Sequence, residues 1–508
     1  MTGPSRRQFM KAIGLGAAAL AVPSWLRAAP STGGRTGPEP APGQAGPAAR
    51  RPNVLYIFTD QQYADMMSCA GNPYLKTPAM DALAARGARF TRAYAANPVC
   101  VPARVGMMTG VMPSRIGMEQ NEDMPQAKAN VTEAILAHSL GRVFRNAGYE
   151  TAYGGKVHLP MTCEAMGFDY ICKNEREGLA DACVAFLRRK HEKPFLLVAS
   201  FINPHDICYM AIRAYAKAGN AGAPAQAAKA AQAPKASPGS APAAVPEDPP
   251  LPAGTSREEF IEKQCPPLPA NFEVPAGEPE GVREVDPRAF RFYVRDHWTK
   301  DDWRLHRWQY CRLTETVDAE ITAVLRALAE AGLEEGTLVV FSSDHGDMDA
   351  SHRLEHKSVL YEESERVPFI VSWKGVTRPG LVDREHLVSA GLDLIPTLCD
   401  FAGIPRPKQG PGLSVRSLAE GRTPPPWRDA LVVEGRHCRS IRTARFKYTV
   451  FDIGEHREML IDLQKDPGEM KNLAQDPACR DALDDCRKRL QQWYRDNGET
   501  LAPGYVVG

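Results

Sequence analysis

The sequence has almost no excess of charge of either sign. Its 508 residues include 62 basic and 61 acidic side chains, which gives a formal net charge of +1. Surfaces that bind nucleic acid normally carry a marked excess of Lys and Arg. The charge balance therefore gives no support for a nucleic-acid-binding protein.

The sequence also lacks paired cysteine motifs. Its 12 cysteines are scattered, and none forms a C-x-x-C pair. This spacing resembles neither a zinc site nor a disulfide framework. We expect most of the cysteines to be thiols, and the spacing leaves open that some of them pair in an oxidising compartment.

Long apolar runs are absent after the N-terminal region. Residues 12–22 are apolar, but they are too few to span a bilayer, and they follow paired arginines within residues 5–11. This pattern resembles a twin-arginine signal peptide over residues 1–29, followed by a Pro/Gly/Ala-rich linker over residues 30–52. We therefore expect the Tat export machinery of a bacterium to export the protein. The mature protein should be periplasmic or secreted and should have no membrane span.

Short apolar runs rich in β-forming residues alternate with helical patterns along most of the chain. The strand-like runs are residues 53–60, 194–206, 337–347 and 367–373, and the helical patterns are residues 77–87, 135–148, 180–192 and 309–332. This alternation predicts an α/β domain over residues 53–423, with a large, mostly parallel central sheet sandwiched by helices. One core rarely extends beyond roughly 250–300 residues, so a second unit is also expected.

Two segments depart from this pattern. Residues 216–254 are low-complexity sequence rich in Ala, Pro and Gln, which cannot bury enough apolar surface to become ordered, so we predict a surface insertion. Residues 424–508 contain short strand-like runs and a final helical pattern at about residues 478–496. They predict a smaller C-terminal subdomain, with an antiparallel sheet and one helix packed on it.

Acids stand at the ends of two predicted strands, as Asp60-Gln61 and Asp344-His345. Ligands of open α/β sheets bind beyond the carboxyl ends of the strands. Carboxylate and amide oxygens suit Ca²⁺, whereas His345 leaves Mn²⁺ open. We expect these four residues to share one divalent cation, although either dipeptide alone is weak evidence, since an acid at a strand end is usually a cap or part of a solvated turn.

A cysteine stands at the start of a further predicted helix, in the stretch NPVCVPARVGMMTG, residues 97–110. Pro102 is tolerated in the first turn, so we expect a helix over about residues 101–109. Cys100 would lie at its mouth and Arg104 on the same face, one turn deeper. A helix N-terminus supports thiolate or oxyanion chemistry, but this segment alone fits an ordinary buried cysteine equally well.

Six segments, in order, resemble those of type I, formylglycine-dependent sulfatases of the alkaline phosphatase superfamily. They are CVPAR (100–104), GGKVHLP (154–160), INPHD (202–206), SSDHGD (342–347), HKSVLYEESERVPFIV (356–371) and the C-terminal EMLIDLQKDPGEMKNLA (458–474). The resemblance covers about residues 52–495, and six ordered matches are far more specific than any one of them.

The resemblance implies hydrolysis of a sulfate ester, on a sulfated carbohydrate. In this family a dedicated maturation enzyme oxidises the motif cysteine to Cα-formylglycine, so Cys100 is expected to become the nucleophile and to join the metal ligands. The hydrated aldehyde has two hydroxyl groups. One attacks sulfur, and the other later loses its proton and expels sulfate, which a serine could not do.

The resemblance also implies roles for five charged or titratable side chains. Arg104 would hold the hydrate, and Lys156 and Lys357 would neutralise the sulfuryl oxygens. His205 would protonate the leaving alkoxide, and His158 would orient the hydrate or take its proton. A single lysine is more typical of a solvated face and a single histidine of an ordinary hydrogen bond, but the ordered motifs favour the catalytic interpretation.

Three positions depart from the commonest family pattern: Gln61, His345 and Ala103. The first two resemble a subset that includes choline-sulfatase-like and phosphonate-monoester-hydrolase-like enzymes. A phosphodiester or phosphonate monoester hydrolase and a choline-sulfatase-like enzyme therefore remain alternatives. A further alternative is a sulfated-glycan-binding protein in which Cys100 is never oxidised. The sugar, the sulfate position and endo or exo action depend on loops and are not predicted.

Overall fold

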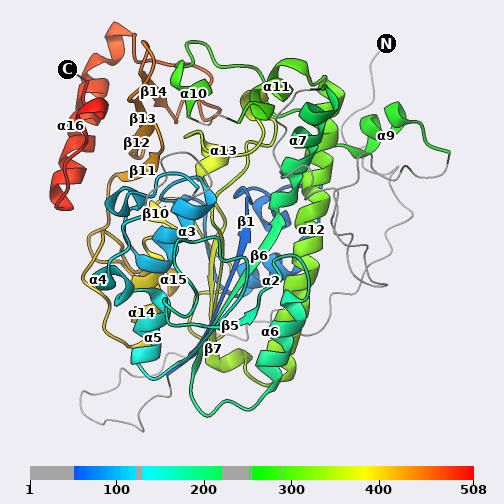
Figure 1. Cartoon of the computed structure of the whole chain (residues 1–508), viewed down its shortest axis with the longest axis vertical. Coiled ribbons are helices and arrows are strands. Elements are labelled where there is room, and N and C mark those ends of the chain that lie inside the picture. The colour runs from blue at the N-terminus through cyan, green and yellow to red at the C-terminus, as the bar shows by residue number, and fades with distance from the viewer. Residues whose placement is uncertain (1–50, 122–128, 220–250, 252–253, 286–287, 508) are drawn as a thin grey trace, which may run out of the picture.

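The computed structural model describes residues 51–121, 129–219, 251, 254–285 and 288–507. The predicted signal peptide and nearly all of the predicted linker lie outside these residues. Most of the predicted insertion does so as well. Figure 1 shows a central sheet between two layers of helices, with a small second sheet and a terminal helix beside them.

The central sheet has eight strands. They are β1 (Asn53–Asp60), β2 (Ala88–Phe90), β4 (Glu150–Gly155), β5 (Asp169–Cys172), β6 (Phe195–Pro204), β7 (Thr337–Ser343), β8 (Phe369–Ser372) and β9 (Leu381–Asp383). Their order is β5-β4-β6-β1-β7-β8-β2-β9, in which β5 to β7 are parallel and β8 is antiparallel to both of its neighbours. This confirms the predicted large, mostly parallel sheet.

Both faces of the sheet are buried, and β1 illustrates the reason. Its side chains alternate between the faces, as the two-residue period of a strand requires. Val54, Tyr56 and Phe58 belong to one hydrophobic cluster, and Leu55 and Ile57 belong to the other. A continuous apolar run of this kind is typical of a parallel strand covered on both sides.

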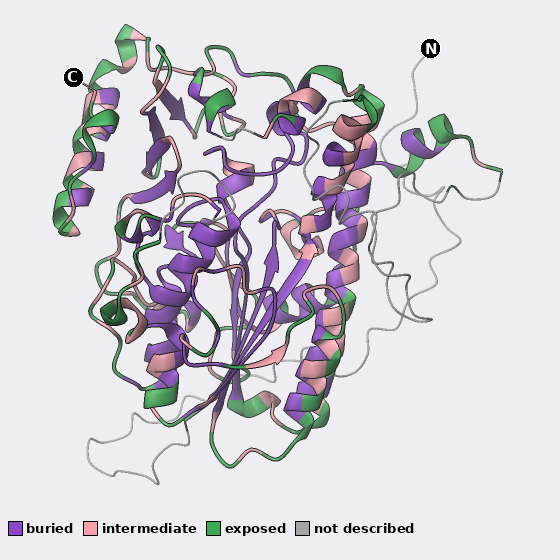
Figure 2. Cartoon of the chain, viewed as in Figure 1, coloured by how far each residue is buried: buried purple, intermediate pink, exposed green. Residues whose placement is uncertain are grey.

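Helices cover both faces of the sheet (Figures 1 and 2). One layer contains α3 (Cys100–Thr109), α5 (Leu140–Asn146) and α14 (Leu394–Ala402), and the other contains α2 (Pro78–Arg86), α6 (Leu179–Arg188) and α12 (Lys300–Glu330). In Figure 2 α3 is buried along its whole length, whereas α12 has both buried and exposed residues.

Two predicted helices differ from the observed ones. Helix α12 begins well before residue 309, because Thr299 and Asp302 form a reciprocal capping box at its start. The single helix predicted over residues 135–148 is divided into α4 (Glu133–Leu136) and α5, because the chain is extended at Ser139.

Several elements were not predicted. They are β2, β4, β5, β9 and α14 and, in addition, β3 (Ala93–Tyr94), β10 (Val388–Ser389), α7 (Cys208–Lys217), α9 (Arg257–Gln264), α10 (Gly281–Glu284), α11 (Phe290–His297), α13 (Glu362–Glu365) and α15 (Arg416–Ala419). Helix α7 includes the first two residues of the range 216–254. Residues 220–250 and 252–253 lie outside the described part of the chain, so the insertion there stays a prediction.

The C-terminal part forms a four-stranded antiparallel sheet and one long helix. The strands, in spatial order, are β11 (Leu431–Gly435), β12 (Cys438–Arg442), β13 (Phe446–Phe451) and β14 (Glu458–Asp462), and α16 (Arg480–Asp496) lies on them. This confirms the predicted small sheet with a packed helix. Lys447 of β13 is fully buried, with its ammonium nitrogen 2.9 Å from a carboxylate oxygen of Glu469 and in ion-pair contact with Glu365 of α13.

Two further features concern the cysteines and the length of the helices. All 12 cysteines are free thiols. Within the described part of the chain, no helix combines the length and the apolar character needed to cross a bilayer.

Candidate active site

Four neighbouring strands end at the same edge of the sheet. Strands β4, β6, β1 and β7 are adjacent and parallel, so their carboxyl ends point the same way. Lys156 follows β4, His205 follows β6, Asp60 ends β1 and Asp344 follows β7. The sheet topology thus brings together four polar side chains that are far apart in the sequence.

Lys156 depends on the glycine before it. Gly155 has a φ of 86°, and a Cβ atom at this position would lie 2.1 Å from the carbonyl oxygen of Ser200. The Lys156 N–H donates to that same carbonyl oxygen at 3.1 Å, which keeps the end of β4 against β6. The ammonium nitrogen of Lys156 then lies 2.7 Å from Asp60 Oδ2.

Helix α3 brings the cysteine to this edge. The helix starts at Cys100, one residue earlier than expected, and ends at Thr109, where Gly110 caps it in the left-handed conformation. The N–H of Val101 donates to Asn121 Oδ1 at 3.1 Å, which fixes the mouth of the helix. Arg104 lies one turn deeper on the face of Cys100, as predicted.

Arg104 is fully buried and joins two of the strand ends. Its Nη2 donates to Asp60 Oδ2 at 2.9 Å, and its Nε donates to Asp344 Oδ2 at 2.8 Å. Its Nη1 donates to the carbonyl oxygen of Lys156 at 2.6 Å and to the Ser200 hydroxyl at 3.0 Å. The guanidinium group therefore fixes both carboxylates and occupies one oxygen of each.

The second carboxylate oxygens of Asp60 and Asp344 lie close to the side chains of Cys100 and His345. Asp60 Oδ1 lies 3.7 Å from both Cys100 Sγ and His345 Nε2. His345 Nε2 lies 3.3 Å from Cys100 Sγ and 3.5 Å from Asp344 Oδ1. All four residues are buried, and one ligand atom from each lies within 4.8 Å of the others.

The four side chains could together hold one metal ion. The two carboxylate oxygens suit a hard cation, whereas the imidazole nitrogen and the sulfur suit a softer one. His345 Nδ1 lies 2.8 Å from the carbonyl oxygen of Gly346, which can only accept. Nδ1 therefore carries the proton, and Nε2 presents a lone pair to the cluster.

Gln61, predicted as a fourth strand-end ligand, makes other contacts. Its Nε2 donates to Asp347 Oδ2 at 2.7 Å, and its Oε1 accepts from Lys357 Nζ at 3.1 Å. Its backbone N–H donates to Asp344 Oδ1 at 3.1 Å. Gln61 thus positions a lysine and a carboxylate, and direct binding of the cation stays a prediction. Asp347 was not predicted, although it is the second acid of the SSDHGD segment.

Two ammonium groups surround the sulfur of Cys100. Lys357 Nζ lies 2.8 Å from it and Lys156 Nζ lies 3.9 Å from it, and both lysines are buried. Burial raises the pKa of the Cys100 thiol, and so does the charge of Asp60. The positive charges around the sulfur, chiefly those of Lys156 and Lys357, hold this pKa well below its usual value. The site therefore stabilises negative charge at position 100.

His205 lies at the more open side of the site, with a side chain that is 18% exposed. Its Nδ1 lies 3.5 Å from Asp206 Oδ1, and Arg176 holds the same oxygen at 2.9 Å. Burial, followed by the charge of Lys156, lowers the pKa of His205 to about 4. Asp206 and Arg176 were not predicted to have a role. Asp206 is the last residue of the INPHD segment, next to His205, whereas Arg176 belongs to none of the six matching segments.

His158 is not joined to this centre by the described contacts. It is half-buried with a φ of 43°, and its Nδ1 has no hydrogen-bond partner in the described part of the chain. Its role in orienting the hydrate stays a prediction.

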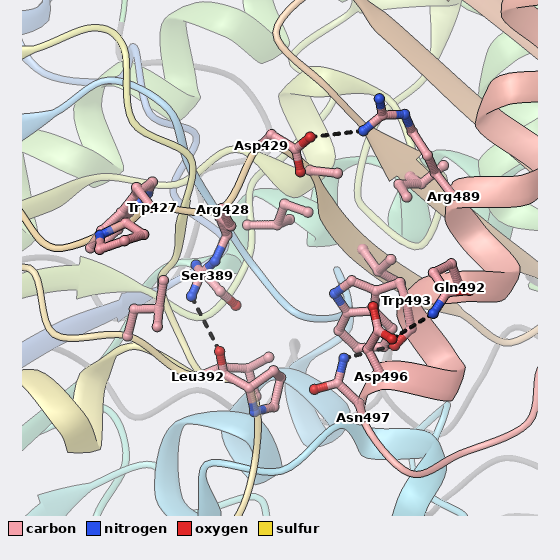
Figure 3. Close-up of a pocket in the computed structure, with 17 residues that line it drawn as sticks. Ser389, Leu392, Trp427, Arg428, Asp429, Arg489, Gln492, Trp493, Asp496 and Asn497 are labelled. Atoms are coloured by element: carbon pink, nitrogen blue, oxygen red, sulfur yellow. Dashed lines mark hydrogen bonds and ion pairs between the residues drawn. The ribbon is translucent and has the colours of Figure 1, made fainter.

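A separate cavity of about 500 Å³ lies between α16 and the end of the catalytic part (Figure 3). Its walls include Trp427 and Trp493, and an ion pair of 2.8 Å joins Arg489 to Asp429 at one side. Cys100 and the charged residues around it do not line this cavity. The chemistry therefore lies at the strand ends and not in this cavity.

Comparisons with known proteins identify the family of this chain. Residues 52–404 match the family model described as Sulfatase, and residues 350–496 match the model described as N-sulphoglucosamine sulphohydrolase, C-terminal. The Delta 4,5-hexuronate-2-O-sulfatase of Bacteroides thetaiotaomicron is 29% identical over 476 residues, covering 89% of this chain and 90% of that protein.

Solved structures give the same result for the fold. A 2-O GAG sulfatase has a TM-score of 0.70 at 26% identity, covering 88% of this chain and 93% of that one. The phosphonate monoester hydrolase of Agrobacterium radiobacter has a TM-score of 0.65 at 22% identity, covering 88% and 96%, and shows the fold alone. Since the first family model spans more than half of the sequence, the chain belongs to the sulfatase family and is a sulfuric ester hydrolase.

Proposed function

We propose that the protein hydrolyses a sulfate ester of a carbohydrate, using a formylglycine made from Cys100 and one divalent cation. The observation that supports this most directly is the arrangement around Cys100 Sγ. Two buried ammonium groups lie close to this sulfur, and so do potential metal-ligand atoms of His345 and Asp60. Such a site favours negative charge on the nucleophile and on the sulfuryl group. An ordinary structural cysteine would need none of these groups.

The cation would be held by Asp60, Asp344, His345 and the side chain at position 100, with Ca²⁺ preferred and Mn²⁺ possible for this donor set. When bound, the cation polarises a sulfate oxygen and the hydrated formylglycine supplies the nucleophilic oxygen. The guanidinium group of Arg104 keeps the carboxylates of Asp60 and Asp344 in place through one oxygen of each.

The remaining side chains act on the sulfate ester itself. Lys156 and Lys357 bind the sulfuryl oxygens where charge accumulates in the transition state. His205, held by Asp206, donates a proton to the departing sugar oxygen. Burial and Lys156 lower its pKa in the free enzyme, and an anionic substrate bound next to it would raise this pKa and favour the protonated form.

The carbohydrate assignment is supported by the relatives. The Bacteroides thetaiotaomicron relative is named for a hexuronate, so sulfated sugars that contain a uronic acid are the first substrates to examine. The twin-arginine pattern in residues 5–11 supports export through the Tat machinery to the periplasm or beyond, and the CVPAR motif supports a maturation enzyme as a transient partner.

The test compares three forms of the protein on one aryl sulfate: converted protein made with a maturation enzyme, unconverted protein, and Cys100→Ser. The converted form should contain a peptide with an aldehyde at position 100, should react with hydrazide probes and should turn over repeatedly. Cys100→Ser should fold normally but fail to turn over, because one hydroxyl can accept a sulfuryl group but cannot release it. Cys69→Ser, a half-buried position outside the donor cluster, is the control. Equal multiple-turnover rates in all three forms would refute the proposal.

The phosphonate or phosphodiester hydrolase is the second candidate, because the same fold serves such an enzyme. Matched aryl sulfate, aryl phosphonate and aryl phosphodiester substrates, with choline sulfate, separate the activities by kcat/KM. We expect the sulfate ester of a sugar or phenol to be preferred.

A further inference from the structure

Gln61 is held at all four of its polar groups by four different residues. It is fully buried, and its φ of 67° lies in the left-handed region that residues other than glycine seldom adopt. Its N–H donates to Asp344 Oδ1 at 3.1 Å, and its carbonyl oxygen accepts from the Tyr310 hydroxyl at 2.6 Å. Its side-chain amide contacts Lys357 at one end and Asp347 at the other. An unusual backbone conformation with every polar group engaged indicates that the orientation of this side chain has a function.

The two neighbours of the Gln61 amide need opposite hydrogen-bonding partners. An ammonium group can only donate, so Lys357 Nζ requires the amide oxygen, which lies 3.1 Å from it. An ionised carboxylate can only accept, so Asp347 Oδ2 requires the amide NH2 group, which lies 2.7 Å from it. Half a turn of the amide would place two donors together at Lys357 and two acceptors together at Asp347. Only one orientation of the amide therefore satisfies both neighbours.

Asp347 is in turn held from its other side. It is fully buried, and its Oδ1 accepts from the N–H of Asp349 at 2.7 Å. Arg307 of α12 fixes the Asp349 carboxylate, with Nη2 at 3.0 Å and Nε at 3.1 Å from Oδ2. Each oxygen of Asp347 thus has its own donor, so the carboxylate cannot turn away from Gln61 without losing the N–H of Asp349.

We propose that Asp347 is a positioning residue, which orients the amide of Gln61 so that its oxygen holds Lys357 beside Cys100. This inference rests on the proposed function and adds a residue to it. Lys357 Nζ lies 2.8 Å from Cys100 Sγ, so the position of its charge depends on the acceptors around it. With the amide reversed, its NH2 group would repel the ammonium group from the place where the sulfuryl oxygens gain charge.

Asp347→Asn tests this orientation with almost no change in shape. The new amide should keep its oxygen on the N–H of Asp349, so its NH2 group should face Gln61. Two NH2 groups cannot hydrogen-bond to each other, so the Gln61 amide should reverse and present its own NH2 group to Lys357. The assay uses converted protein and an aryl sulfate at about pH 8, where the wild-type Asp347 is mostly ionised. We expect kcat to fall about 10–100-fold.

Adding Gln61→Glu to this variant should restore most of the lost activity. A carboxylate at position 61 has an oxygen at both ends, so it accepts from Lys357 and from the new amide in either orientation. A role of Asp347 in folding alone would not be corrected by a change at position 61. Wild type, both single variants and the double variant form a double-mutant cycle, in which we expect a coupling of about 10-fold or more in kcat. A wild-type kcat in Asp347→Asn would overturn the proposal, and so would a double variant no faster than Asp347→Asn.

Asp318→Asn is the matched control. This buried carboxyl of α12 also accepts from backbone N–H groups, those of Ala79 and Met80, and it lies outside the group of potential metal ligands around Cys100. The control should leave kcat unchanged, and thermal melts should show that every variant is folded.

Crystal structures of the unconverted proteins give a readout that needs no turnover. Lys357 Nζ should leave its contact with position 61 in Asp347→Asn and regain it in the double variant. A Lys357 that stays in place in Asp347→Asn would overturn the proposal. These results are distinct from failure of the proposed function, in which the converted wild-type enzyme would not hydrolyse the aryl sulfate at all.

Discussion

The ammonium nitrogen of Lys357 lies 2.8 Å from the sulfur of Cys100, although the two residues are 257 positions apart in the sequence. Gln61 holds the same ammonium group through its amide oxygen at 3.1 Å. This charge is part of the chain itself, so position 100 is prepared for an anion before any cation binds.

Lys357→Met should reverse this effect. In unconverted protein the variant should raise the pKa of the Cys100 thiol toward its ordinary value, because one of the charges that lowers it is lost. The ultraviolet absorbance of the thiolate against pH, corrected with Cys100→Ser, measures the shift. In converted protein we expect kcat to fall about 10²–10³-fold. An unchanged thiol titration would contradict the electrostatic role.

Asp344→Asn should separate cation binding from folding. Asn keeps an oxygen acceptor for Arg104 Nε but removes a negative ligand, so we expect divalent-cation affinity to fall more than about 100-fold with the fold intact. Asp344→Ala is a poorer variant, since it leaves the buried Arg104 partly unpaired at a cost of roughly 3–5 kcal/mol. Elemental analysis and thermal melts measure the two effects. Full cation occupancy in Asp344→Asn would contradict the assignment.

His205→Gln should affect substrates according to their leaving group. A sugar alkoxide is strongly basic and needs the proton, so kcat should fall about 10²–10⁴-fold on a sugar sulfate. The anion of an acidic nitrophenol leaves without a proton, so the same variant should lose little on its sulfate ester. His138→Gln, at an exposed position, is the control. Equal losses on both substrates would point to a structural role for His205.

Glu320 lies away from the active site and should make the stability of the protein depend on pH. Burial, with a contribution from Asp181, raises the pKa of this α12 carboxyl to about 7. The folded state then binds the proton more tightly than the unfolded state, so this group's contribution to stability falls as pH rises from about 4.5 to 7. Glu320→Gln should be more stable than wild type by roughly 1–2 kcal/mol at pH 8 and similar to it at pH 4. Urea melts measure this, with the exposed Glu335→Gln as the control. A difference that does not change with pH would contradict the assignment.

The parts of the fold that were predicted carry a local signal. Strand β1 matches the range predicted for it, residues 53–60, because its run of β-forming residues ends abruptly at an acid. Helix α3 was predicted to within one residue by the position of Pro102. Strand β4 was missed, because residues 150–155 are short and end in two glycines. Gly155 is required by its contact with β6 and Gly154 by its contacts with α6 and β5, which no local pattern reveals.

The same distinction holds for the active site. Cys100, Arg104 and the strand-end acids belong to motifs whose residue types suggest their chemistry. Arg176 acts through Asp206, which lies 30 residues away in the sequence, so the neighbours of Arg176 in the sequence give no indication of a role. The order of the strands, and not any single segment, decides which of these side chains meet.

The buried ammonium group of Lys447 has a consequence for how the protein can be divided. It lies in the C-terminal sheet, yet Glu365, one of its partners, belongs to α13 beside the catalytic core, and Ser114 makes a similar link to Glu434 of β11 through its hydroxyl at 2.6 Å. Cutting the chain after residue 423 would leave the buried Glu365 without its cation on one fragment and Lys447 with only Glu469 of these two partners on the other. Neither fragment should therefore melt cooperatively alone, whereas the intact chain should lose both sheets in one transition, observable by calorimetry. Recombination or domain exchange in this family would have to carry both sides of this contact together.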